Sequence, residues 1–223
     1  MISRMKLGRN QLKWLAILTM LIDHFAYIFL FNQEDWYDLG RAVGRISFPL
    51  ICFVLVQGFF STKNVWKYIM RMFILALLSE IPFDLAFSHS LFDISSQNVI
   101  FTLCMGLLVL VGMRYWENRW GMQAVCVFAG IFLSWVLHTD YNWFGIALIA
   151  IFYKTGNQKI EQFIMAGLMI LMYGEKEIAT FLSFPVLFLY DAEKKERTFL
   201  RHVFYAFYPV HLLLYYMIRR FSI

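Results

Sequence analysis

Three ionisable residues stand in the first apolar stretch of the chain. Lys13 opens the run Lys-Trp-Leu-Ala-Ile-Leu-Thr-Met-Leu-Ile-Asp-His, which closes with Asp23 and His24. A histidine whose pKa lies near neutrality can take a proton from an attacking amine or hydroxyl and return it to a leaving group. Ionisable groups are costly within an apolar segment, so the Asp-His pair indicates a functional site.

Two carboxylates form the second feature with chemical potential. Glu80 and Asp84 are four residues apart and therefore share a helix face, while Pro82 between them is expected to kink or end that helix. Neighbours on a helix point about 100° apart, so Asp23 is poorly placed to orient His24. A carboxylate from another helix, Asp84 or Glu80, is the better candidate to fix the tautomer of the imidazole. The other polar candidates in apolar stretches are Arg45, Asn98, His138, Asp140 and His211.

The composition defines the elements that must position these residues. Of 223 residues, 61% are hydrophobic and 16% are charged, which excludes an ordinary water-soluble domain. A bilayer core takes about 20 helical residues per crossing. We therefore expect an all-α, polytopic transmembrane helical bundle with about nine spans, forming one integral-membrane domain over residues 1–223. The expected spans are 11–31, 46–61, 66–87, 98–114, 120–138, 143–154, 160–174, 178–190 and 202–219.

The distribution of Lys and Arg predicts the orientation of the chain. These residues accumulate on the cytoplasmic side of membrane proteins. With a cytoplasmic N-terminus, most of the 20 Lys and Arg residues fall inside, whereas Arg41, Arg45 and Lys176 fall in outer loops and Arg219 and Arg220 follow the last span. The expected inner residues are Arg4, Lys6, Arg9, Lys13, Lys63, Lys67, Arg71, Arg114, Arg119, Lys154, Lys159, Lys194, Lys195, Arg197 and Arg201.

This topology brings polar groups of six segments to the outer half of the membrane. Each residue also has a simpler interpretation: Arg45 can snorkel or pair with the carboxylates, Asn98 can cap a helix, and His138 and Asp140 can be loop residues. His211 could be a second base, a substrate contact or a polar group in helix packing. The net charge of +5 reports topology, so no nucleic-acid partner is expected. No metal is expected either, because His138-x-Asp140 supplies too few ligands.

Five motifs, in order along the chain, carry a family resemblance. They are Asp23-His24, Gly44-Arg-Ile-Ser-Phe-Pro49, Ser79-Glu-Ile-Pro-Phe-Asp84, Gln97-Asn-Val-Ile-Phe-Thr102 and Phe207-Tyr-Pro-Val-His211. Together they resemble the TraX family, whose named member is the F-pilin N-acetyltransferase of conjugative plasmids. The Lys13-x10-His24 spacing is also similar to the Arg/Lys-x10-His motif of membrane acyltransferases.

The resemblance implies acetyl transfer from cytosolic acetyl-CoA to an extracytoplasmic acceptor, an amine more than a hydroxyl. The acceptor would be a peptide, a pilin-like protein or a glycan, and the protein would be a multi-pass component of the bacterial cytoplasmic membrane, surrounded by lipids. His24 is the expected general base, with Asp84 and Glu80 as further catalytic residues. Substrate binding is expected at Asp23, Arg45, Asn98, His138, Asp140 and His211, and acetyl-CoA binding at Lys13, Lys67 and Arg71. Asn98 or Arg45 would stabilise the oxyanion.

Two other classes of function fit the same residues. A proton-coupled transporter also uses intramembrane Asp, Glu and His, although no inverted repeat is visible between the halves of the chain. A non-catalytic membrane component of a conjugation or secretion assembly is the second alternative. It predicts that His24, Glu80 and Asp84 can be replaced by apolar residues without loss of the assembly.

Overall fold

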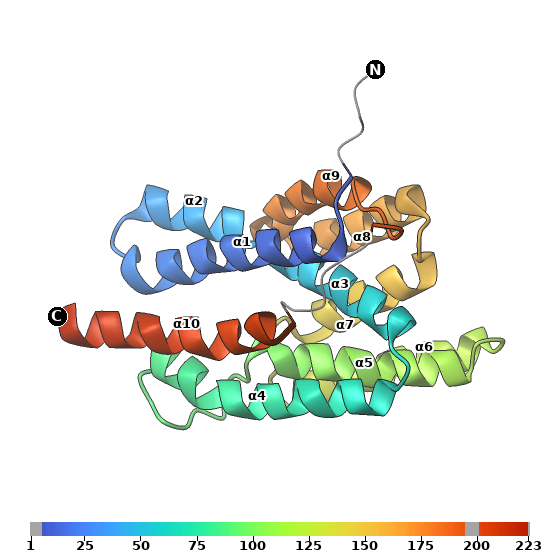
Figure 1. The fold of residues 1–223 in the computed structure, drawn as a ribbon, viewed down its shortest axis with the longest axis horizontal. Coiled ribbons are helices and arrows are strands. Elements are labelled where there is room, and N and C mark those ends of the chain that lie inside the picture. Colours follow the sequence, from blue (N-terminus) through green and yellow to red (C-terminus); the bar gives the residue numbers. More distant parts are fainter. Residues whose placement is uncertain (1–5, 195–200, 223) are drawn as a thin grey trace, which may run out of the picture. The chain divides into compact units, whose positions relative to one another are not determined.

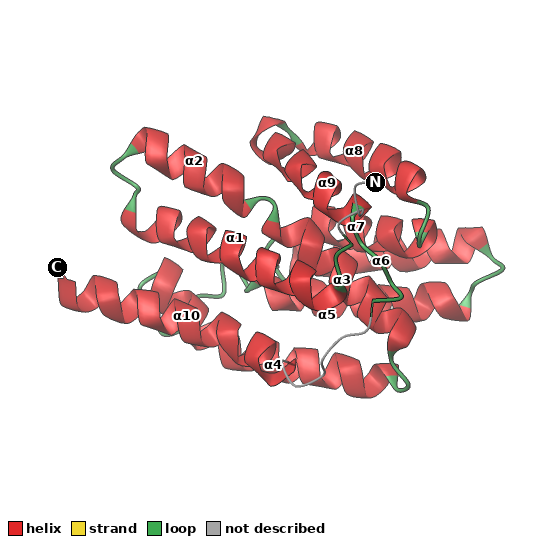
Figure 2. Ribbon diagram, turned by 45° about the horizontal axis from the view of Figure 1, so that its top comes forward, coloured by secondary structure: helices red, strands yellow, loops and turns green. Residues whose placement is uncertain are grey.

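The computed structural model describes residues 6–194 and 201–222, and this part of the chain is helical apart from loops and two isolated backbone bridges (Figures 1 and 2). The helices are α1 (Arg9–Phe29), α2 (Glu34–Gly44), α3 (Ser47–Ser61), α4 (Val65–Phe87), α5 (Val99–Tyr115), α6 (Trp120–Val136), α7 (Asn142–Thr155), α8 (Lys159–Tyr173), the 3-10 helix η1 (Glu175–Leu182), α9 (Ser183–Phe188) and α10 (Arg201–Ser222).

The described helices follow the expected spans closely. The expected 46–61, 66–87 and 98–114, for example, correspond to α3, α4 and α5. The expected span 178–190 is instead divided between η1 and the short α9, and α4 continues through Pro82 to Phe87 rather than ending at the proline. By length and apolar composition, two stretches of the described residues suffice to cross a membrane, Arg9–Phe29 and Glu34–Ser61. Nine crossings and a cytoplasmic N-terminus stay predictions, and Arg4, Lys195 and Arg197 lie outside the described residues.

Helix α2 is an element that the sequence pattern did not predict, because residues 32–45 were expected to form an outer loop. Its first turn carries Glu34 and Asp35, whose negative charges favour a helix N-terminus, and its last turn carries Arg41. The chain turns back after α1 through a bond from the Gln33 N–H to the Leu30 carbonyl, 2.8 Å long. Residues that were assigned to a loop therefore lie alongside α1.

The structure divides into two compact units, and the first comprises residues 1–54 and 157–223. Its central feature is α1, which packs against α2 on one side and α10 on another (Figures 1 and 2). Two glycines make the α2 contact close. A Cβ at Gly40 would collide with the Cβ of Ala26, and one at Gly44 would collide with the carboxylate of Asp23. The spacing Gly40-x3-Gly44 is that of close helix packing in membrane proteins.

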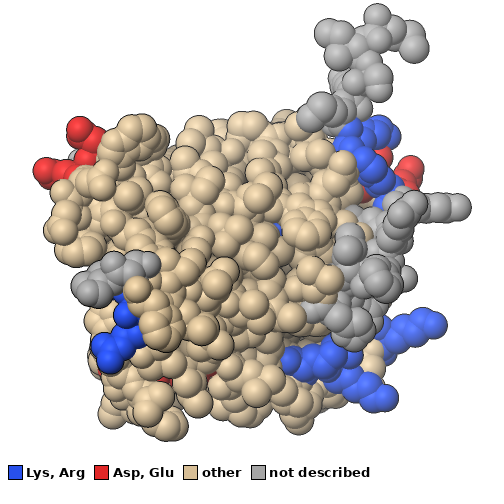
Figure 3. Space-filling view, turned by 60° about the vertical axis from the view of Figure 1, so that its left-hand side comes forward, with Lys and Arg blue, Asp and Glu red and all other residues tan. Residues whose placement is uncertain are grey.

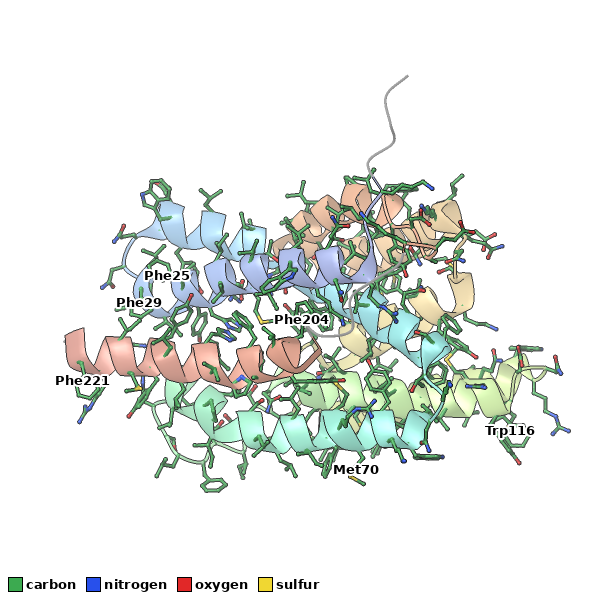
Figure 4. All side chains as sticks on the ribbon, in the orientation of Figure 1. Phe25, Phe29, Met70, Trp116, Phe204 and Phe221 are labelled. Carbon is green, nitrogen blue, oxygen red and sulfur yellow. The ribbon has the colours of Figure 1, made fainter. Side chains whose placement is uncertain are left out.

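Helices α1 and α10 run parallel, which their ring contacts demonstrate. Trp14 near the start of α1 contacts Phe204 near the start of α10, with ring centroids 5.2 Å apart, and Phe29 at the end of α1 contacts Tyr215, 5.7 Å apart. Figure 4 shows Phe25, Phe29 and Phe204 along this interface. The Tyr215 hydroxyl also donates to the Leu21 carbonyl at 3.2 Å. The parallel packing brings the middle of α1 to the middle of α10.

The second unit, Leu55–Gly156, contains α4 to α7 and the end of α3. Small residues allow close packing around α5: Gly106 faces Ile149 of α7, and Gly130 of α6 faces Val109. Helix α5 begins at Asn98, whose Oδ1 accepts from the Ile100 N–H at 3.0 Å, so the interpretation of Asn98 as a helix cap is confirmed.

Both units bury polar groups and expose apolar ones. Buried polar side chains include Thr19, Ser79, Asp84, Asn98, Thr102, Gln123, Glu177 and His211, whereas exposed apolar side chains include Leu18, Ile22, Leu77, Leu78, Phe128, Phe132, Ile164 and Leu168. The visible surface in Figure 3 is accordingly formed mostly by uncharged residues. Water-soluble monomers rarely expose so much contiguous apolar surface, which is what a lipid-facing exterior requires.

Candidate functional site

The first unit joins two of the predicted site residues, His24 of α1 and His211 of α10. The Nδ1 atom of His24 lies 2.7 Å from Nε2 of His211. The ring planes differ by 5° and the centroids are 5.0 Å apart, so the rings meet edge to edge, nearly in one plane. The other ring nitrogen of His211, Nδ1, lies 2.9 Å from the Phe207 carbonyl one turn earlier in α10.

Aromatic rings surround this histidine pair. Phe207 stacks on His211 at 4.7 Å between centroids, and Tyr208 and Tyr215 approach it edge-on at 5.6 and 5.9 Å. His211 is buried, with 4% of its surface exposed, and His24 is partly buried. The rings hold the His211 imidazole in a fixed plane and limit the access of water to it.

Asp23 faces α2 rather than α10. Its Oδ2 atom forms an ion pair of 2.6 Å with Nη1 of Arg41, while Oδ1 is buried beside Gly44 without a hydrogen-bond partner. The direction of the Asp23 side chain agrees with the expectation that Asp23 does not orient His24. Arg41 was expected in an outer loop, but α2 returns it to the level of Asp23.

A second ion pair continues this polar region toward η1. Arg45 Nε lies 3.1 Å from Oε1 of Glu177, whose other oxygen accepts from the Thr180 hydroxyl at 3.1 Å. The Glu177 side chain is only 5% exposed. Removing one member of a buried pair leaves the other charge uncompensated, which typically costs about 3–5 kcal/mol. The two pairs therefore tie α1, α2 and η1 together.

In the second unit, Glu80 and Asn98 form a direct contact. The Asn98 backbone N–H donates to Glu80 Oε2 at 3.3 Å, and the Asn98 side-chain amide donates to the same oxygen and to the Ala76 carbonyl, 2.9 Å away. Both amide protons of Asn98 are thus engaged, which leaves its side chain without a further donor for an oxyanion. Arg45, the other residue predicted for that role, pairs through Nε with Glu177.

Asp84 organises the loop after α4. Its Oδ2 atom accepts from the Asp93 N–H at 3.0 Å, and the Asp93 carboxylate in turn accepts from the Ser95 N–H at 2.9 Å. Hydrogen bonds from Ser88 and Ser95 lower the pKa of the Asp93 carboxyl to about 2. On α4 itself, Ser79 Oγ, Glu80 Oε1 and Asp84 Oδ1 are buried without a hydrogen-bond partner. Buried polar atoms in this state are uncommon and mark α4 as a further functional candidate.

The segment 138–140 lies next to the start of α5. The Gln97 N–H donates to the His138 carbonyl and the Asp140 N–H donates to the Gln97 carbonyl, each at 2.9 Å. The Thr102 hydroxyl donates to the Asp140 carbonyl. His138 has a positive φ of 50°, an unusual conformation for a residue with a side chain, and that side chain is exposed. His138 and Asp140 thus contribute backbone contacts here.

The residues expected to bind acetyl-CoA lie in two units. Lys13 of α1 places its ammonium 4.9 Å from the centre of the Phe204 ring. Lys67 and Arg71 lie exposed in the first two turns of α4, with the Arg71 guanidinium 5.8 Å from the Tyr68 ring. No three His, Cys, Asp or Glu side chains of the described residues are grouped to hold a metal ion.

Each unit therefore assembles part of the predicted site. Asp23, His24, Arg45 and His211 belong to the first unit, and Glu80, Asp84, Asn98, His138 and Asp140 to the second. The proposed partnership of His24 with Glu80 or Asp84 stays a prediction. Sequence reasoning missed Arg41 and Glu177. The glycine spacing around Arg41 was the available signal, because it predicts a closely packed helix rather than a loop.

The fold and the site define a class of helical proteins with exposed apolar side chains and buried polar side chains in each unit. Within that class, residues 8–219 match the profile of a family described as TraX protein. The chain is also 30% identical over 228 residues to a probable fimbrial assembly protein, FimC of serogroup H1, from Dichelobacter nodosus, and the match covers 92% of each chain. The chain belongs to the TraX family. The comparison with solved structures found no match.

Proposed function

We propose that the chain is a membrane-embedded acetyltransferase that moves an acetyl group from cytosolic acetyl-CoA to an extracytoplasmic amine. The observation that carries the proposal is the position of His24, partly buried in the C-terminal half of α1 and hydrogen-bonded to His211 on the parallel helix α10. A histidine held by a second group and removed from bulk water is suited to general base catalysis. The family resemblance supplies the acetyl chemistry.

In the proposed reaction the lone pair of the neutral acceptor amine forms a bond to the thioester carbonyl carbon, and the carbonyl oxygen gains negative charge. As this bond forms, His24 takes a proton from the amine nitrogen. Arg45, whose Nε pairs with Glu177, is the residue proposed to stabilise this oxyanion with its positive charge. The carbon–sulfur bond then breaks, coenzyme A leaves as a thiolate, and the proton from His24 passes to its sulfur.

The cationic residues of the proposed donor site suit the phosphates of acetyl-CoA. Lys13 precedes His24 by eleven residues, which places it about 16 Å away along α1. An extended pantetheine arm would bridge such a separation between phosphates at Lys13 and a thioester at His24. Lys67 and Arg71 are exposed on α4 of the second unit, and their contact with acetyl-CoA stays a prediction.

The test uses purified protein in detergent with labelled acetyl-CoA and a panel of primary amines and N-terminal peptides. Wild type is expected to transfer the label, and His24→Ala is expected to lose roughly 10²–10⁴-fold in kcat, the range that a positioned general base contributes. His89→Asn is the matched control, because His89 is exposed after α4 and has a positive φ that Asn tolerates. Equal rates of acetyl transfer by wild type and His24→Ala would contradict the assignment of His24 as the general base.

The name of the Dichelobacter nodosus relative favours a second candidate, a membrane component of fimbrial assembly without catalysis. This candidate predicts that apolar replacements of His24, Glu80 and Asp84 leave assembly intact. Counting surface fibres in cells that carry such variants separates the two functions, provided that membrane levels of the protein are unchanged.

A further inference from the structure

The histidine pair belongs to a chain of hydrogen bonds whose direction can be deduced. The Phe207 carbonyl oxygen can only accept, so the His211 Nδ1 atom, 2.9 Å away, must carry the proton of that bond. A neutral imidazole has one protonated nitrogen and one lone pair. The lone pair of a neutral His211 is therefore on Nε2, the atom that faces His24.

A hydrogen bond donated in the opposite direction, from His211 to His24, would require His211 to be a cation. If Nε2 of His211 donated to His24, both of its nitrogens would be protonated. The described contacts of His211 are the backbone of Phe207 and Tyr208, the second histidine and the rings of Phe207, Tyr208 and Tyr215, none of which carries a negative charge. A buried cation without an anionic partner is costly, so His24 Nδ1 is the donor.

We propose that His211 is a positioning residue that holds His24 as the Nδ1–H tautomer, with the reactive lone pair of His24 on Nε2. The contribution to rate rests on the proposed acetyl transfer, whereas the tautomer itself does not. Which nitrogen of a histidine is protonated is set by the bond that the other one makes. In this protein the Nδ1 atom of His24 faces an imidazole that is itself fixed by a backbone carbonyl.

The arrangement also stabilises His24 after it has taken a proton. His24 protonated at Nε2 still donates from Nδ1 to His211, and this bond is stronger once the donor is charged. His211 keeps its own proton on Nδ1 throughout. The proton therefore moves from the acceptor amine to His24 Nε2 and then to the coenzyme A sulfur, without passing through His211.

The rate test compares two replacements of His211. His211→Phe keeps an aromatic ring but removes the acceptor, and His24 is then expected to shift toward the Nε2–H tautomer that predominates in water. We expect kcat to fall at least about 10-fold, within the range that general base catalysis contributes, with an unchanged KM for acetyl-CoA. His211→Gln places an amide oxygen at a similar reach and is expected to recover part of the loss.

The control variant is Phe29→Leu, which removes a ring contact between α1 and α10 at the end of α1. It is expected to retain wild-type kcat. If Phe29→Leu and His211→Phe lower kcat equally, or if His211→Gln is no better than His211→Phe, the effect is one of helix packing and the positioning role is refuted.

Nitrogen NMR of ¹⁵N-histidine-labelled protein tests the tautomer without any activity. The signals of His24 and His211 are identified by their loss in His24→Ala and His211→Ala. A protonated Nδ1 and an unprotonated Nε2 in His24 support the proposal, and the reverse pattern, or a cationic His211, overturns it. A protein that has the expected tautomer but transfers no acetyl group would contradict the proposed function and still support the tautomer.

Discussion

At the scale of single residues, the central observation is that the partner of His24 is another histidine. The two are 187 positions apart, and no spacing in the sequence connects them. The carboxylates of α4, which residue chemistry alone favours as partners, contact Asn98 and Asp93 within the second unit, and their partnership with His24 stays a prediction. Residue type thus predicts which groups are reactive, while their pairing depends on helix packing.

Lys13 allows a prediction about donor binding. Lys13→Ala is expected to raise the KM for acetyl-CoA more than it lowers kcat, because a phosphate contact acts equally on the ground and transition states. Steady-state kinetics over a range of acetyl-CoA concentrations measures the two effects. A fall in kcat at unchanged KM would instead assign Lys13 a structural role beside Phe204.

The Asp23–Arg41 pair allows a prediction about stability. Arg41→Met leaves the partly buried Asp23 carboxylate without its ion-pair partner and is expected to cost about 1–3 kcal/mol. The double variant Asp23→Leu/Arg41→Met removes both charges and is expected to be more stable than Arg41→Met alone. Unfolding in detergent compares them. A double variant less stable than either single one would show that the pair does not behave as a coupled buried ion pair.

At the scale of helices, the close approach of α2 to α1 depends on two glycines. Gly40→Ala places a methyl group against Ala26 and is expected to cost about 1–3 kcal/mol of stability. The compensating variant Gly40→Ala/Ala26→Gly restores the space between the helices and is expected to recover part of the lost stability. Gly121→Ala is the control, since no atom lies within 4 Å of the added carbon. Equal effects of Gly40→Ala and Gly121→Ala in thermal unfolding would contradict the packing.

The loop after α4 allows a pH prediction. The Asp93 pKa is lowered from 3.8 to about 2. The ionised carboxylate therefore stabilises the folded state fully at pH values above about 4, and this stabilisation is lost as the pH falls from there toward 2. Wild type is therefore expected to lose more stability than Asp93→Asn over that interval. Melting temperatures of the two proteins at several acidic pH values measure the difference, and parallel curves would contradict the assignment.

The helices that the sequence predicted well are those with long apolar runs. Runs such as 66–87 and 98–114 give their approximate bounds directly, because apolar length reflects helix length in such chains. Helix α2 was not predicted because it is short and carries Glu34, Asp35 and Arg41, a composition that resembles a polar loop. Glu177 was not predicted as a site residue because η1 is a 3-10 helix at the edge of an apolar run.

At the scale of the molecule, the parallel course of α1 and α10 predicts the sides of the termini. If both helices cross the membrane, residues 201–222 end on the side opposite to the start of α1. With the predicted cytoplasmic N-terminus, Arg219 and Arg220 then lie outside. Cysteines introduced at Lys6 and Arg220 are expected to react with an impermeant reagent from opposite sides of intact cells. Reaction of both from one side would contradict the crossing of one of the two helices.

The measurement that tests the central claim most directly places the donor and the acceptor on opposite sides of a membrane. Proteoliposomes that contain a trapped, impermeant primary amine are supplied with labelled acetyl-CoA from outside. Wild type is expected to label the trapped amine, and His24→Ala is expected to do so at least about 100-fold more slowly. Equal labelling by the two proteins, or labelling only when donor and amine share a compartment, would contradict acetyl transfer across the membrane through His24.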